Sequence, residues 1–307
     1  MELTTTLPSG VWPVMLTPLH DDGAIDWAGL DALTEWYLQA GVTGLFAVCL
    51  SSEMYLLTPE ERLQVASHVI ARVNGRVPVV ATGTYGGPVP EQAEFVRRIS
   101  DAGMRAIVIV TCQLASAAEP EAVFMARMEA LLGLTGAIDL GLYECPAPYK
   151  RILSAEVYGA LAHTGRFVFH KDTTCDAAAM RLKLIAGQGT RLNLYNANTP
   201  TALATLQLGA AGVSCIAANV YPELLVWLCR NWESQPAKAE RMQRMLTLLD
   251  LVVSAKYPTS AKRMLQMRGL PISLMTRGGV AAFNGEDAVQ HANALAVVDE
   301  LMTLCVL

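Results

Sequence analysis

One lysine, Lys171, ends an apolar, strand-like run, Arg166-Phe-Val-Phe-His-Lys171, and is followed directly by Asp172-Thr-Thr. Burial at the end of such a strand disfavours the charged form of a lysine and lowers its pKa. The neutral amine can then attack a carbonyl carbon and form a Schiff base. The alternative is a solvent-exposed lysine paired with a nearby acid, and the local segment alone favours this alternative. The elements that position Lys171 therefore decide between the two.

Short apolar runs alternate with amphipathic stretches, which is typical of parallel strands covered by helices. The turn before one such stretch, Thr58-Pro-Glu-Glu61, has the N-cap, first-turn proline and capping-box glutamate of a helix start. Eight strand–helix repeats predict a (β/α)8 TIM barrel, and no Gly-x-Gly-x-x-Gly follows the first strand to indicate dinucleotide binding. The expected strands are 10–16, 44–49, 77–83, 105–110, 137–143, 167–171, 192–195 and 212–216.

Beyond residue 235 the pattern is helical throughout, interrupted at Tyr257-Pro258, at Gly269-Leu-Pro271 and at Gly278-Gly279. We therefore expect a barrel over residues 1–235 and a C-terminal helical segment over residues 236–307 that packs on it. Of the 307 residues 52% are hydrophobic and 17% are charged, which is enough apolar surface for one large core.

Composition and charge exclude several classes of protein. The net charge of −5, without a stripe of Lys and Arg, gives no footprint for nucleic acid. The N-terminus lacks the basic and apolar regions of a signal peptide, and no apolar run reaches the roughly 18 residues of a membrane span. The 7 cysteines include no Cys-x-x-Cys pair and the 5 histidines show no metal-ligand spacing. We therefore expect a reduced, cytoplasmic protein without a metal site.

Barrel enzymes carry their chemistry at the carboxyl ends of the strands. A lysine, a tyrosine and hydroxyl groups at one mouth favour carbonyl chemistry, with the lysine as nucleophile and the phenol as proton donor and acceptor. In this chain the strand-end positions are Thr17, Ser51, Ser52, Glu53, Thr111, Tyr143, Glu144, Lys171, Thr173, Asn196 and Ala218.

Five pieces of the sequence stand in a specific order and spacing, although each alone is a weak signal. They are Val14-Met-Leu-Thr-Pro18, Ser51-Ser52-Glu53 before the helix start at Thr58, Tyr143-x-x-Pro146, Lys171-Asp-Thr, and the segment from Leu208 to Val220. Together, over residues 10–269, they resemble the dihydrodipicolinate synthase / N-acetylneuraminate lyase family of pyruvate-handling class I aldolases. The chain looks like a divergent member of this family.

The resemblance implies that Lys171 is the Schiff-base lysine and Tyr143 the phenol that moves the proton. It also implies that Ser51 and Ser52 hold the carboxylate of a keto acid, because amides and hydroxyls in a turn before a helix suit an anion. Their alternative role is to form the turn. Further substrate contacts are expected from Thr173, Ser214, Asn196 and Glu144. For Glu144, strand alternation equally allows a side chain that points away from the barrel axis and braces a loop.

Several positions depart from the family pattern. Leu50 replaces the usual hydroxyl before Ser51, and Cys112-Gln113-Leu114 replaces a segment whose tyrosine joins a proton relay across a subunit interface. Pro148 stands where dihydrodipicolinate synthases carry a characteristic arginine, with Lys150 nearby. These departures argue against a true dihydrodipicolinate synthase and do not match sialic acid cleavage closely.

We therefore expect a Schiff-base-forming lyase of the aldolase type that acts on pyruvate or a pyruvate-derived 2-keto acid. No metal or organic cofactor is needed, because the imine replaces the Lewis acid. A 2-keto-3-deoxy sugar acid dehydratase of the same family is one alternative, and a non-catalytic keto-acid or sugar-acid binding protein is another. The resemblance implies a homotetramer, while the missing tyrosine at Leu114 leaves a plain dimer open. Charge and hydropathy predict no nucleic-acid or membrane partner.

Overall fold

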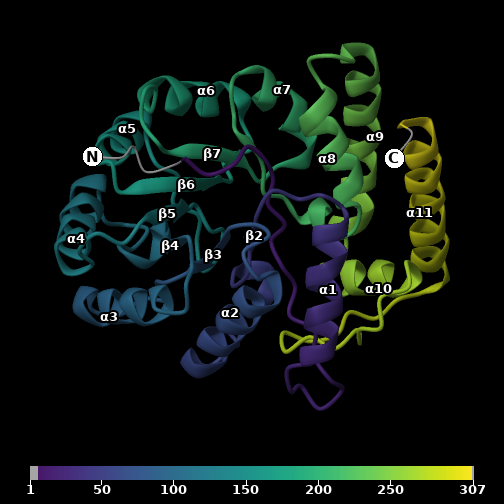
Figure 1. Cartoon of the computed structure of the whole chain (residues 1–307), viewed down its shortest axis with the longest axis horizontal. Helices are drawn as coiled ribbons and strands as arrows, with labels where there is room; N and C mark the ends of the chain where they lie inside the picture. Colours follow the sequence, from purple (N-terminus) through teal and green to yellow (C-terminus); the bar gives the residue numbers. More distant parts are fainter. Residues whose placement is uncertain (1–5, 306–307) are drawn as a thin grey trace.

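The computed structural model describes residues 6–305 and confirms the (β/α)8 barrel with C-terminal helices (Figure 1). Neighbouring strands are parallel and follow the order β1-β8-β7-β6-β5-β4-β3-β2. The strands are β1 (Gly10–Val11), β2 (Leu45–Phe46), β3 (Val79–Thr82), β4 (Ala106–Val110), β5 (Leu140–Tyr143), β6 (Phe167–Asp172), β7 (Asn193–Asn196) and β8 (Gly212–Val213).

The barrel closes beyond β1, where the chain passes beside β2. The amide of Met15 donates to the carbonyl of Phe46 (3.0 Å), and the amide of Phe46 donates to that of Pro13 (3.0 Å). The strands β1, β2 and β8 are much shorter than the runs expected from the sequence. At the pairing of β1 with β8, Gly212 lies against Gly10, and a side chain at Gly212 would collide with the backbone carbonyl of Gly10.

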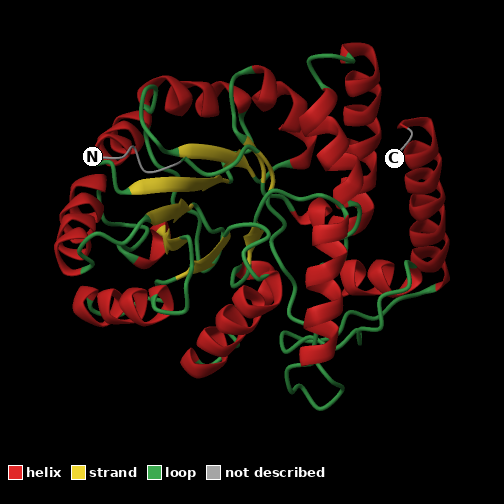
Figure 2. Ribbon diagram, viewed as in Figure 1, coloured by secondary structure: helices red, strands yellow, loops and turns green. Residues whose placement is uncertain are grey.

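Helices surround the strands on the outside (Figure 2). The capping box predicted for α2 is present, since Thr58 Oγ1 accepts from the amide of Glu61 (3.2 Å) and Glu61 Oε2 accepts from the amide of Thr58 (2.8 Å). The helices of the repeats are α1 (Trp27–Gln39), α2 (Pro59–Val73), α3 (Val89–Ser100), α4 (Glu121–Leu134), α5 (Ala155–His163), α6 (Ala177–Ala186), α7 (Ala202–Gln207) and α8 (Pro222–Asn231).

Three more helices follow the last repeat: α9 (Pro236–Ser254), α10 (Thr259–Met267) and α11 (Gly285–Cys305). Both α9 and α11 pack against α8 at one side of the barrel (Figure 1). Between α10 and α11 the chain runs as an extended segment back to the barrel mouth. Within residues 6–305, no helix combines the length and the hydropathy that crossing a membrane requires.

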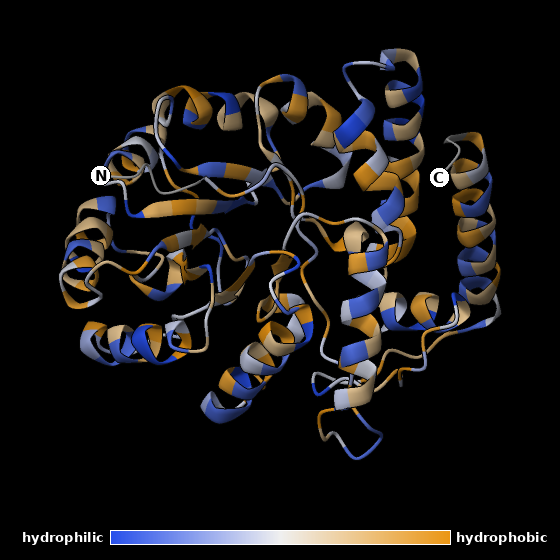
Figure 3. Ribbon diagram, viewed as in Figure 1, coloured by the Kyte–Doolittle hydropathy of each residue, from blue (hydrophilic) through white to orange (hydrophobic). Residues whose placement is uncertain are grey.

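Hydrophobic and hydrophilic residues alternate along the helices (Figure 3). In α2 the buried positions are Val65, Ala66, Val69 and Val73, a spacing that lies on one helical face. The same amphipathic pattern predicts this helix from the sequence.

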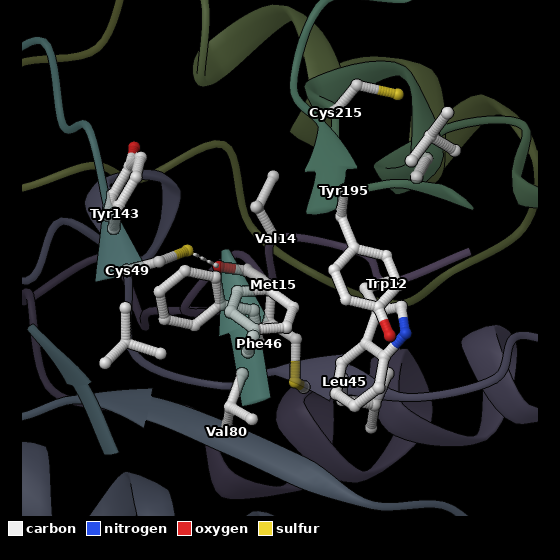
Figure 4. Close-up of a cluster of buried hydrophobic side chains, with 14 of the residues drawn as sticks. Trp12, Val14, Met15, Leu45, Phe46, Cys49, Val80, Tyr143, Tyr195 and Cys215 are labelled. Atoms are coloured by element: carbon white, nitrogen blue, oxygen red, sulfur yellow. Dashed lines mark hydrogen bonds between the residues drawn. The ribbon is translucent and has the colours of Figure 1, made fainter. Parts of the chain in front are cut away.

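Aromatic side chains fill the barrel interior. The rings of Phe169 and Tyr195 stack with centroids 4.9 Å apart, and Trp12 lies 5.3 Å from Phe169. In Figure 4, Tyr143 lies at the border of this cluster with its phenol oxygen directed away from it. The packed interior therefore closes the barrel below the carboxyl ends of the strands and forms the floor of any cavity there.

Candidate active site

A cavity of about 620 Å³ opens at the carboxyl end of the barrel, and both Lys171 and Tyr143 line it. The two side chains are 5% and 2% exposed. Their Cα atoms are partners in the register of β5 and β6, and Lys171 Nζ lies 4.7 Å from the centroid of the Tyr143 ring. The structure thus brings together the lysine and the phenol that the sequence singled out, and Lys171 is buried rather than exposed to solvent.

Burial lowers the pKa of the Lys171 amine below its ordinary value, against the opposing influence of the thiols of Cys49, Cys145 and Cys215. These cysteines are free. A lowered pKa increases the fraction of neutral amine, which is the nucleophilic form. The position of Lys171 therefore favours attack on a carbonyl group.

Burial has the opposite effect on the neighbouring phenol. It raises the pKa of Tyr143 well above the ordinary value, and Cys145 and Cys49 act in the same direction. The phenol therefore stays protonated at neutral pH. In this form its hydroxyl can both donate and accept a hydrogen bond, as a group that passes a proton must.

The adjacent serines Ser51 and Ser52 lie in different surroundings. Ser51 lines the cavity. Ser52 is fully buried, and its Oγ donates to the carbonyl of Met15 (2.6 Å) and accepts from the amide of Cys49 (3.1 Å). Ser52 therefore fastens the 3₁₀ turn Leu50–Ser52 to the segment that follows β1, and Ser51 is the one of the two serines that lines the cavity.

Thr173 also lines the cavity, where its Oγ1 donates to the carbonyl of Glu144 (2.5 Å). Asn196 does not line it. The register pairs Asn196 with Asp172 rather than with Lys171, so its side chain lies on the other face of the sheet. There its amide donates to Thr201 and Thr205 (both 2.9 Å).

Ser214 and Glu144 are completely buried and lie outside the cavity lining. Ser214 Oγ has no hydrogen-bond partner among the described residues. Glu144 Oε1 lies 2.6 Å from Lys183 Nζ, on the outer side of β5. For Glu144 the structure thus supports the bracing alternative rather than a contact with substrate.

Three side chains outside the cavity have the chemistry of metal ligands. Glu144, His170 and Asp172 offer ligand atoms that lie within 4.8 Å of one another. Lys183 Nζ lies among them, 2.6 Å from Glu144 Oε1 and 2.7 Å from Asp172 Oδ2. The cation that these carboxylates hold is therefore the ammonium group of Lys183.

The chain after α10 contributes a wall of the cavity that the sequence did not predict. Thr276, Gly278 and Gly279 line it, as does Tyr257. Glu53 Oε2 accepts from the amide of Gly278 (2.9 Å), which ties this segment to the loop after β2. The sequence indicates this wall only through the interruptions of the helical pattern at Tyr257-Pro258 and Gly278-Gly279, because the chain has to leave a helix to reach the barrel mouth.

Comparisons with known proteins agree with this geometry. Residues 7–296 match the sequence model of the dihydrodipicolinate synthetase family. The 4-hydroxy-tetrahydrodipicolinate synthase of Marinobacter nauticus is 30% identical over 72% of this chain and 74% of its own, and that of Thioalkalivibrio sulfidiphilus is 29% identical over 85% and 88%. YagE, a prophage protein of the dihydrodipicolinic acid synthase family from E. coli K12 in complex with pyruvate, has a TM-score of 0.84 at 24% identity, covering 95% of this chain and 98% of that one.

Proposed function

The chain belongs to the dihydrodipicolinate synthetase family, and from this premise we propose that it is a Schiff-base-forming lyase of the aldolase type that acts on pyruvate or a pyruvate-derived 2-keto acid. The observation that carries the proposal is the buried pair at the barrel mouth, with Lys171 Nζ 4.7 Å from the Tyr143 ring. The pyruvate complex of the related YagE supports the class of ligand.

In this reaction the neutral Lys171 amine attacks the C2 carbonyl of the keto acid, and loss of water gives a protonated imine. Loss of the proton from the C4 hydroxyl then releases C4 as an aldehyde, and the electron pair of the C3–C4 bond moves toward the imine nitrogen and leaves an enamine. Protonation at C3 and hydrolysis release pyruvate and free the amine. Tyr143 passes the protons, and the Ser51 hydroxyl binds the carboxylate of the substrate.

We further propose that the reaction differs from that of the relatives named 4-hydroxy-tetrahydrodipicolinate synthase. Leu50 lines the cavity, so this wall offers a side chain without a hydroxyl. Gln113, in the segment where the family has aromatic residues, donates to the Tyr55 hydroxyl of its own chain (2.9 Å). A homotetramer is the proposed assembly, with a dimer as the alternative, and light scattering distinguishes them.

Borohydride reduction in the presence of pyruvate, followed by intact-mass measurement, tests the proposal. We expect one adduct on the native protein and none on Lys171→Ala. Lys238→Ala is the control, because Lys238 is an exposed lysine of α9 that does not line this cavity, and its removal should leave the adduct in place. If pyruvate and other 2-keto acids give no adduct, the protein is not an imine-forming enzyme.

A screen of 2-keto-3-deoxy sugar acids then distinguishes the reactions. An aldolase releases pyruvate and an aldehyde, whereas a dehydratase loses water and keeps all the carbon atoms in one product. An adduct without any turnover would favour the binding protein over both enzymes.

A further inference from the structure

Four titratable side chains form a buried polar cluster on the outer side of β5 and β6, directly behind the pair Tyr143 and Lys171. They are Glu144, His170 and Asp172, each 0% exposed, and Lys183, which is 2% exposed. In sequence, Glu144 follows Tyr143, while His170 and Asp172 flank Lys171. Because side chains alternate along a strand, the two reactive groups point into the barrel and the polar cluster points away from it.

Lys183 is the centre of the polar cluster and comes from α6. Its Nζ lies 2.6 Å from Glu144 Oε1, 2.7 Å from Asp172 Oδ2 and 3.0 Å from Thr174 Oγ1. An ammonium group has three protons to donate, and these three acceptors use them all. One amine thus connects the residue after Tyr143 with the residue after Lys171.

The carboxylate of Glu144 connects the two loops that leave these strands. It accepts from the amide of Leu153 (2.9 Å), which precedes α5, and from the amide of Thr173 (3.3 Å), which follows β6. Asp172 Oδ1 accepts from the amide of Thr174 (2.7 Å). The polar cluster therefore determines the course of the chain at the point where both strands end.

From Thr173 the connection continues into the cavity. Its carbonyl accepts from Lys150 Nζ (2.9 Å) and from Cys175 Sγ (3.3 Å), and all three residues line the cavity. A continuous set of hydrogen bonds thus joins Lys183, which does not line the cavity, to a wall of the site.

We propose that Lys183 is a positioning residue for imine formation: by holding Glu144 and Asp172 together, it sets the relative placement of Tyr143 and Lys171 and keeps the Thr173 wall closed. This inference rests on the proposed function. It adds a role for residues that neither touch the substrate nor line the cavity.

Stability alone is a poor explanation for the polar cluster. A buried ion pair often contributes no more to stability than apolar residues of similar volume, because desolvation of the charges offsets their attraction. Moreover, neither ring nitrogen of His170 has a hydrogen-bond partner among the described residues, although Nε2 lies 3.6 Å from Glu144 Oε1. Burial acts to raise the pKa of Glu144, but His170 and Lys183 outweigh it and lower the pKa to about 2. Glu144 is therefore charged at neutral pH and needs its cation.

The opposite end of the same sheet provides a matched control. Asp139, just before β5, pairs with Arg191, just before β7, through N–O distances of 2.9 Å to both carboxylate oxygens. Arg191 and Asp139 are 18% and 19% exposed. This ion pair joins the amino ends of the strands, whereas the cavity lies at their carboxyl ends. Its loss should therefore affect the stability of the fold without changing the placement of Tyr143 and Lys171.

The experiment compares the native protein with Lys183→Met, with the triple variant Lys183→Met/Glu144→Gln/Asp172→Asn, and with Arg191→Met. The triple variant removes the two carboxylate charges together with the ammonium charge, so we expect it to fold even where the single variant does not. For each folded protein, the rate of borohydride trapping with pyruvate is measured against pyruvate concentration and against pH. Circular dichroism checks the fold.

We expect the triple variant to trap pyruvate at least ten times more slowly at saturation. The pH profile of its trapping rate should also move to higher pH. A loosened wall admits water to Lys171, and solvation brings the pKa of the amine closer to its ordinary value. Arg191→Met should lose thermal stability but keep the native rate and profile. A folded triple variant with the native rate and profile would overturn the inference, and a triple variant that cannot fold would show that the polar cluster is a requirement of the fold instead. Absence of trapping in the native protein would overturn the proposed function itself, and this role with it.

Discussion

The neighbouring residues Ser51 and Ser52 should have opposite phenotypes when each is replaced by alanine. Ser52→Ala removes a hydroxyl that is completely buried, donates to Met15 O at 2.6 Å and accepts from Cys49 N at 3.1 Å. Leaving such buried groups unpaired costs about 1–3 kcal/mol. For a chain of this size, that loss lowers Tm by about 2–5 °C.

Ser51→Ala should instead weaken binding. The Ser51 hydroxyl lines the cavity, and under the proposed function it donates to the carboxylate of the keto acid. A hydrogen bond to a charged group contributes about 1.5–3 kcal/mol. Its loss raises the half-saturating pyruvate concentration about 10- to 100-fold, since about 1.4 kcal/mol corresponds to a factor of ten. The Tm should change less than in Ser52→Ala.

The assay is borohydride trapping over a range of pyruvate concentrations, combined with thermal unfolding followed by circular dichroism. The reasoning is refuted if Ser52→Ala shifts the half-saturating concentration while its Tm equals that of the native protein. It is also refuted if Ser51→Ala binds pyruvate as the native protein does. Each variant serves as the control for the other, because they differ by one position in the same turn.

Two further predictions concern the pH dependence of Lys171 and the closure of the barrel. Burial lowers the pKa of Lys171 in the folded state, so between that value and the ordinary 10.5 the unfolded chain binds a proton that the folded chain does not. The contribution of Lys171 to the free energy of unfolding should therefore rise with pH through this window. In chemical denaturation at several pH values, Lys171→Met should show a smaller rise than the native protein, while the rise from Lys262, whose pKa burial lowers to about 8, remains. Gly212→Ala places a Cβ against the backbone carbonyl of Gly10, which cannot rotate away. We expect a loss of about 3 kcal/mol or more, seen as a lower denaturation midpoint or as insoluble protein, whereas native-like stability would show that β1 and β8 can separate at no cost.

The sequence was sufficient for Lys171 and Tyr143 because each ends an apolar strand, and barrel topology brings strand ends to one mouth. It could not separate Ser51 from Ser52, since their orientations depend on a 3₁₀ turn that ends at Glu53 in the left-handed region, with φ of 58°. The end of the seventh strand predicts Asn196 in the site, but its register partner is Asp172, so its side chain lies on the outer face.

The role of Lys183 lay beyond the sequence for a different reason. It belongs to a helix, 11 positions after Asp172, and its partnership with Glu144 spans 39 positions. Nothing in the spacing of single residues indicates which turn of α6 packs against which strand. Such a pairing follows only from the packing of α6 on the barrel. For Glu144, which follows Tyr143 directly, the sequence does limit the side chain to two alternatives, the inner or the outer face of the sheet.

The burial of Lys171 and Tyr143 also bears on which carbonyl compounds the site can accept. Burial lowers the pKa of the amine and raises that of the phenol, so it favours the neutral form of both groups. The imine that the proposed function requires is protonated, so a positive charge forms in this buried space. Glu53, a carboxylate that lines the cavity, already accepts from Gly278 N and lies 3.8 Å from Lys262 Nζ. Under the proposed function the carboxylate of the substrate supplies a further counter-charge, because an unpaired buried charge is costly. A simple ketone or aldehyde lacks that group, so we expect it to form the imine less readily than a 2-keto acid does, independently of any hydrogen bond from Ser51.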